Sequence, residues 1–124
     1  MSKKRILLID DERNLCDIMR VNLERDGGYE VETAYSGLEG IQKATAADFD
    51  LVITDLKMPC IGGDIVLEAL KAIKPHSPVV ICSVYHDDTK TISRTIREKA
   101  DAIIGKPIDH HELYQAIEQA LTQG

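Results

Sequence analysis

Short apolar runs alternate with helical patterns along the whole chain. The runs at 5–9, 51–55, 78–83 and 102–105 are rich in Ile, Val and Leu, which is typical of strands buried on both faces. Residues 29–34 alternate between polar and apolar side chains, as an edge strand does. The pattern predicts five βα units, and hence a parallel α/β sheet with helices on both faces and right-handed crossovers.

Between the strands, apolar residues recur at helical spacing. The inward faces are expected to contain Leu15, Ile18, Met19 and Leu23, then Leu38, Ile41 and Ala44, then Val66, Leu67, Leu70 and Ile73, then Ile92 and Ile96, and finally Leu113, Ala116, Ile117, Ala120 and Leu121. The expected N-caps are Ser36 with Glu39 as a capping box, Asp64, Asp87 or Asp88, and Asp109 with Glu112. Gly27-Gly28 is expected to end the first helix.

Length and charge limit what the chain can be. Its 124 residues fit one domain, taken as 1–124. A net charge of −6, with no basic block beyond Lys3-Lys4-Arg5, argues against direct nucleic-acid binding. No apolar run reaches membrane-spanning length and no signal peptide is present, so we expect a soluble, cytoplasmic protein without membrane contact. The three cysteines, Cys16, Cys60 and Cys82, are an odd number without CxxC spacing, which favours reduced thiols.

Polar side chains stand where four of the predicted strands end. They are Asp10 and Asp11 after the first strand, Asp55 at the end of the third, Ser83 at the end of the fourth and Lys106 after the fifth. Carboxyl ends of parallel strands share one edge of a sheet, so these side chains can converge in one crevice. Three crowded carboxylates repel one another unless a cation joins them, and hard oxygen ligands suit Mg²⁺ best.

The same set of residues suits phosphoryl transfer. A hydroxyl and an ammonium provide what a tetrahedral phosphoryl group needs once Mg²⁺ has neutralised part of its charge. A carboxylate can itself be the nucleophile, giving an acyl phosphate. Asp55 is the candidate, because it ends the middle strand between the acidic pair and Lys106.

These motifs together resemble the receiver domain of the two-component response-regulator family, over the whole chain. They are Asp10-Asp11, then Asp55-Leu56-Lys57-Met58-Pro59 with Gly63 eight residues past Asp55, then Ser83, then Lys106-Pro107. The resemblance implies a doubly wound, flavodoxin-like three-layer sandwich of (βα)5 type with strand order 2-1-3-4-5. It further implies that a sensor histidine kinase, a phosphotransfer protein or a small phosphodonor phosphorylates Asp55, in a domain that catalyses only its own phosphorylation and dephosphorylation.

The resemblance also implies a role for each site residue. Asp11 would bind Mg²⁺ directly, Asp10 mainly through water, and Asp55 and the backbone carbonyl of Lys57 would complete the protein ligands. Ser83 would hydrogen-bond the phosphoryl group. Lys106 would pair first with Asp55 and then with the phosphoryl oxygens, from a cis Lys106-Pro107 bond.

The expected output is protein contact. The family places its signalling face on the fourth helix, fifth strand and fifth helix, which would meet a downstream effector or form a phosphorylation-dependent homodimer. The fourth helix is unusually polar, so we expect it to be weakly anchored and able to move. Ile103 stands where the family has its switch aromatic. Tyr85 is a possible substitute, and we hypothesise that Tyr85 and Lys57 control access of the water that hydrolyses the phosphoryl group.

Three other readings remain. A flavin mononucleotide binder shares the architecture, but acids follow the first strand where that class needs a phosphate cradle. A phosphatase with a nucleophilic Asp would usually carry a second acid two residues on, where this chain has Lys57. The third reading is a degenerate, non-phosphorylated receiver that acts as a protein-interaction scaffold.

Overall fold

The computed structural model describes residues 3–84 and 93–123. Five strands form one parallel sheet in the order β2-β1-β3-β4-β5. The strands are β1 (Arg5–Ile9), β2 (Glu30–Ala34), β3 (Leu51–Asp55), β4 (Val79–Ser83) and β5 (Ala102–Gly105). The helices are α1 (Arg13–Asp26), α2 (Gly37–Ala46), α3 (Gly63–Ile73), α4 (Arg94–Lys99) and α5 (His110–Gln123). The predicted doubly wound, flavodoxin-like fold and its strand order are confirmed.

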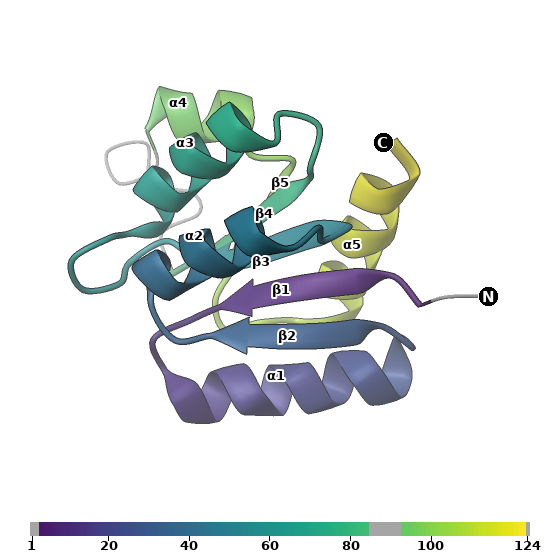
Figure 1. Ribbon diagram of the computed structural model, residues 1–124. Coiled ribbons are helices and arrows are strands. Elements are labelled where there is room, and N and C mark those ends of the chain that lie inside the picture. The colour runs from purple at the N-terminus through teal and green to yellow at the C-terminus, as the bar shows by residue number, and fades with distance from the viewer. Residues whose placement is uncertain (1–2, 85–92, 124) are drawn as a thin grey trace.

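The sheet separates two helical layers, as Figure 1 shows. Successive residues of a strand point to opposite faces, so Ile6 and Leu8 pack with α1 and α5, whereas Leu7 and Ile9 pack with α2, α3 and α4. Every residue of β3 and β4 is buried, because these strands have a neighbour on each side and helices above and below. This burial explains why their sequences are apolar without alternation.

Helix boundaries follow the capping signals in part. Ser36 Oγ accepts from the Glu39 N–H at 3.1 Å, and Asp109 Oδ1 accepts from the Glu112 N–H at 3.1 Å. The expected cap at Asp64 is wrong. The third helix begins two residues earlier than expected, at Gly63 after its N-cap Gly62, and places Asp64 within the first turn. A carboxylate there still favours the positive helix end.

The fourth helix is short in the part of the chain that the structure describes. It begins at Arg94, where Ser93 Oγ accepts from the Ile96 N–H at 3.2 Å. The expected caps Asp87 and Asp88 lie outside the described residues, as does Ile92. Within α4, Ile96 is the buried residue.

Four predicted core residues are instead exposed. They are Leu15 and Ile18 on α1, Leu38 on α2 and Ile73 on α3. On α1 the inward positions are taken by Cys16 and Leu23, with Met19 partly buried. The helix therefore turns its most apolar stripe partly away from the sheet. None of the described helices is both long enough and apolar enough to cross a membrane.

Candidate functional site at the carboxyl ends of the strands

The acidic residues meet at the ends of β1 and β3. Asp10 follows Ile9 directly, and its N–H donates to the Ala34 carbonyl at 3.0 Å, which continues the sheet by one residue. Ligand oxygens of Asp10, Asp11 and Asp55 all lie within 4.8 Å of one another. The sequence prediction that these three carboxylates converge is confirmed by this geometry. In the described residues they are the one group with metal-ligand spacing, and the exposed pair His110-His111 is outside it.

The loop after β3 is held close to the sheet. The Leu56 N–H donates to the Cys82 carbonyl at 2.9 Å, and the Gly63 N–H donates to the Leu56 carbonyl at 2.8 Å. A Cβ at Gly63 would meet the carbonyl oxygen of Asp55. Glycine is therefore required there, because the start of α3 passes directly over the strand end that carries Asp55.

Lys106 follows β5 and reaches the carboxylates at the ends of β1 and β3. Its backbone N–H donates to the Ser83 carbonyl at 3.0 Å, which aligns the end of β5 with the end of β4. Its Nζ lies 2.9 Å from Asp55 Oδ1 and 3.6 Å from Asp10 Oδ2. The Lys106-Pro107 peptide bond is cis, as the resemblance implied.

Burial and charge act in opposite directions on this pair. Burial raises the pKa of Asp55 above its ordinary value; the Lys106 ammonium lowers it in part, and the carboxylates of Asp10 and Asp11 raise it again. Burial by itself would lower the pKa of Lys106, but the hydrogen bond and negative charge of Asp55, together with Asp10, raise it. The raised pKa of Asp55 therefore comes mainly from burial, whereas the raised pKa of Lys106 comes from the carboxylates beside it.

This donor set fits a divalent cation. Three carboxylates with one ammonium leave net negative charge, and all the acidic ligands are hard oxygens. Mg²⁺ and other oxygen-seeking divalent ions prefer such donors. Asp10, Asp11 and Asp55 are the side chains that would hold the ion.

A cavity of about 170 Å³ opens beside Asp55, and we call it the strand-end cavity. Its lining consists of Glu12, Asp55, Lys57, Ser83, Val84 and Lys106. Asp55 and Ser83 are buried and form its floor, whereas Glu12, Lys57 and Val84 are exposed and form its rim. A carboxylate, a hydroxyl and an ammonium therefore face one small space, which is large enough for a tetrahedral oxyanion.

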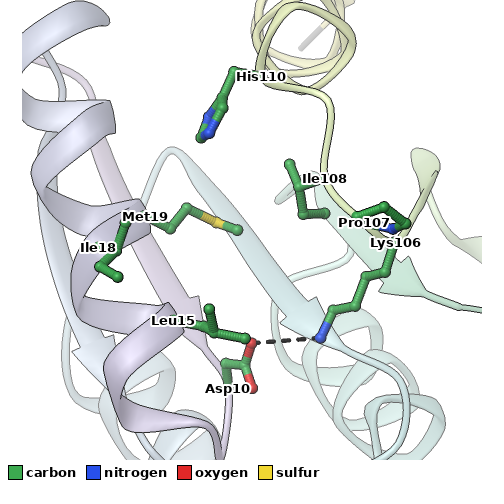
Figure 2. A pocket seen from close by; sticks show the side chains of 8 residues that line it. All are labelled: Asp10, Leu15, Ile18, Met19, Lys106, Pro107, Ile108 and His110. Atoms are coloured by element: carbon green, nitrogen blue, oxygen red, sulfur yellow. Dashed lines mark ion pairs between the residues drawn. The ribbon is translucent and has the colours of Figure 1, made fainter.

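A second, more apolar cavity of about 260 Å³ lies on the other side of Lys106, and we call it the α1–β5 cavity. Its lining consists of Asp10, Leu15, Ile18, Met19, Lys106, Pro107, Ile108 and His110. In Figure 2, Leu15 and Met19 extend from α1 toward the side of Pro107 and Ile108, and the Asp10–Lys106 ion pair lies below them. Asp10 and Lys106 thus belong to this cavity and to the acidic site at once.

Comparison with known proteins decides the family. The family profile described as "Response regulator receiver domain" matches residues 6–118. The chain belongs to the response-regulator receiver-domain family. The receiver domain is 33% identical over 118 residues to the transcriptional regulatory protein GlrR of Escherichia coli (strain K12), and 33% identical over 120 residues to the response regulator ArlR of Staphylococcus aureus. These alignments cover 95% of this chain, but only 26% of GlrR and 52% of ArlR.

Solved structures share the whole architecture of this receiver domain. A CheY-like response regulator receiver domain protein from Methanospirillum hungatei JF-1 superposes with a TM-score of 0.90 and 31% identity, covering 98% of this chain and 96% of that one. The response regulator TrrA from Thermotoga maritima, solved in complex with Mg(2+)-BeF, gives a TM-score of 0.85 and 29% identity, covering 94% and 98% of the two chains.

Sequence reasoning found the chemical groups of the receiver site but missed parts of its surroundings. Glu12 and Val84 were not identified as cavity residues, although each directly follows a motif residue in the chain. Leu15 and Ile18 were assigned to the core, and they line the α1–β5 cavity instead. Tyr85, the suggested substitute for a switch aromatic, lies outside the described residues. Ile103 is partly buried and packs with the cluster beneath α2, α3 and α4.

Proposed function

We propose that this receiver domain accepts a phosphoryl group on Asp55 from a sensor histidine kinase or a phosphotransfer protein. The observation that carries the proposal is the 2.9 Å pair of Asp55 and Lys106 on the floor of a cavity that also contains Ser83. An Asp55 carboxylate oxygen would attack phosphorus while the bond to the donor breaks, leaving an acyl phosphate on Asp55. The donor's leaving group departs with the electron pair of that bond.

The neighbouring residues have distinct parts in this step. Lys106 would move its ammonium from the Asp55 carboxylate to the new phosphoryl oxygens, and the Ser83 hydroxyl would donate a hydrogen bond to one of them. Asp10, Asp11, Asp55 and the Lys57 carbonyl would hold Mg²⁺. Bound there, Mg²⁺ would neutralise part of the charge on the transferring group. The complex of the relative TrrA with Mg(2+)-BeF supports this ligand for the family.

The α1–β5 cavity supports a protein as the donor. Leu15 and Ile18 are 51% and 57% exposed, and their apolar surface is continuous with Lys106 and Asp10 at the acceptor site. A helix carrying a phosphohistidine can bury these side chains while it presents the phosphoryl group to Asp55. Cys16 and Cys82 are buried free thiols, which fits phosphoryl transfer between two proteins in the reducing cytoplasm.

The output would pass through α4, β5 and α5 to a downstream effector or a second copy of the chain. The relative GlrR is a transcriptional regulatory protein, which supports an effector of that kind. Since α4 is anchored through Ile96, a shift at Ser83 can be transmitted to it at low energetic cost.

Intact mass after incubation with Mg²⁺ and acetyl phosphate tests the proposal. We expect one base-labile phosphoryl adduct on the wild type and none on Asp55→Asn. An adduct on the Asn variant would assign another acceptor. Mg²⁺ binding without any adduct, from small donors or from kinases, would favour the non-phosphorylated scaffold.

A further inference from the structure

Glu12 lies on the rim of the strand-end cavity in a fixed backbone position. Its N–H donates to Asp10 Oδ1 at 3.0 Å, and its carbonyl accepts from the Cys16 N–H at 2.9 Å. It is the N-cap residue of α1, yet within the described part of the chain its carboxylate makes no capping hydrogen bond. Glu12 instead lines the strand-end cavity together with Asp55 and Lys106.

The rim is where the leaving group of a phosphodonor has to depart. Attacking and leaving atoms lie in line through phosphorus, so a group that Asp55 displaces from the floor points outward. The exposed rim residues are Glu12, Lys57 and Val84. A departing group therefore passes these three residues, of which Glu12 is the acidic one.

We propose that Glu12 is a specificity-determining residue, whose carboxylate makes Asp55 accept phosphoryl groups from nitrogen-linked donors in preference to acyl phosphates. This inference rests on the proposed phosphorylation of Asp55. It goes further, since it names one residue outside the acidic cluster that selects the class of phosphodonor.

The two donor classes differ in charge at the rim. Phosphoramidate carries its nitrogen as an ammonium near neutral pH; Asp55 attacks phosphorus, the P–N bond breaks, and neutral ammonia leaves with the electron pair. With acetyl phosphate the P–O bond breaks, and acetate leaves as an anion. A carboxylate at the rim attracts the ammonium nitrogen of bound phosphoramidate and repels the acetate anion that forms from acetyl phosphate. The Lys57 ammonium on the same rim partly offsets Glu12 and remains when Glu12 is neutralised.

The test compares Glu12→Gln with wild type, using phosphoramidate and acetyl phosphate as donors and intact mass as the readout. We expect the ratio of the acetyl phosphate rate to the phosphoramidate rate to rise about two- to five-fold in Glu12→Gln, and this rise to shrink in high salt. Glu12→Asp, which keeps the charge, should retain most of the wild-type preference.

Glu118→Gln is the matched control, because it removes the same charge from the exposed face of α5. An equal change in this control, or no change in Glu12→Gln, would overturn the inference while leaving phosphorylation of Asp55 intact. Calorimetric Mg²⁺ titration provides a second readout. A large loss of Mg²⁺ affinity in Glu12→Gln, with both donors slowed in parallel, would assign Glu12 to the metal instead. No adduct from either donor would overturn both proposals.

Discussion

At the end of β3, Asp55 is a carboxylate whose burial disfavours its charged form. It is 8% exposed, and the Lys106 ammonium at 2.9 Å only partly compensates for burial and for the neighbouring acids. The pKa of Asp55 is therefore higher in the folded chain than its ordinary value of 3.8. The unphosphorylated site therefore carries uncompensated negative charge, and a bound cation stabilises it by neutralising part of that charge.

This excess charge predicts that Asp55→Asn stabilises the metal-free domain. A raised folded pKa means that the folded state holds the proton more tightly than the unfolded chain, so the penalty develops as pH rises through the folded pKa. We expect a gain of roughly 1 kcal/mol in the free energy of unfolding at pH 7, the size of a typical substitution effect. The gain should vanish as pH falls below the unfolded pKa, where Asp55 is neutral in both states.

Urea unfolding without Mg²⁺ measures this difference at both ends of the pH range. The control is Asp64→Asn, an exposed carboxylate in the first turn of α3. A less stable Asp55→Asn at pH 7 would mean that the ion pair with Lys106 outweighs burial and repulsion.

At the scale of elements, helix packing is set by a few close approaches. α2 crosses β1 so closely that a Cβ on Gly40 would meet the side chain of Ile9, which is fully buried. Helix propensity favours Gly40→Ala by up to about 1 kcal/mol, but overpacking a core typically costs roughly 1–3 kcal/mol. We expect Gly40→Ala to destabilise the domain by about 1 kcal/mol in urea unfolding. Gln42→Ala, exposed on the same helix, should be neutral or slightly stabilising, and an equal gain in both variants would show that Ile9 can move aside.

The exposed stripe of α1 leads to a kinetic prediction. Ile18→Asp adds a charge to the apolar wall of the α1–β5 cavity. With a sensor kinase that phosphorylates the wild type, we expect transfer to slow about ten-fold, which corresponds to about 1.4 kcal/mol of lost contact. Phosphorylation by acetyl phosphate should be unchanged. Ile73→Asp, at a similarly exposed position on α3, is the control, and equal loss in both variants would move donor docking away from α1.

At the scale of the whole molecule, the parallel sheet brings distant residues to one edge. Asp10, Asp55 and Lys106 are separated by most of the chain, and their positions depend on the register of β1, β3, β4 and β5. A ligand that binds only this assembled edge stabilises the whole fold.

Mg²⁺ should therefore raise the melting temperature. At a free concentration about one hundred times its Kd, a ligand of the folded state adds about 2.7 kcal/mol. We expect a saturable rise of several degrees in thermal unfolding for wild type, reversed by a chelator and absent from Asp11→Asn. Asp64→Asn should retain the rise. A similar rise in Asp11→Asn would show that Mg²⁺ acts through general screening.

The order of elements and the chemistry of the strand ends could both be read from the sequence. The short length of the buried runs of β3 and β4, their β-branched residues and the polar residues that follow them distinguish these runs from helices and indicate which residues end them. The acids, hydroxyl and lysine follow directly, because a residue after a parallel strand has to lie at its carboxyl edge. The caps at Ser36 and Asp109 are predictable because each side chain accepts a hydrogen bond from a backbone N–H only three residues away in the sequence.

Only the tertiary structure decided which apolar residues are buried and which line cavities. Leu15 and Ile18 have the helical spacing of core residues, but the rotation of α1 about its axis depends on its packing with β1 and α5. The same holds for Glu12 and Val84, whose place on the rim depends on loops from different strands meeting. Periodicity records which face of an element is apolar, whereas the angle at which that face meets its neighbours is a property of the whole packed chain.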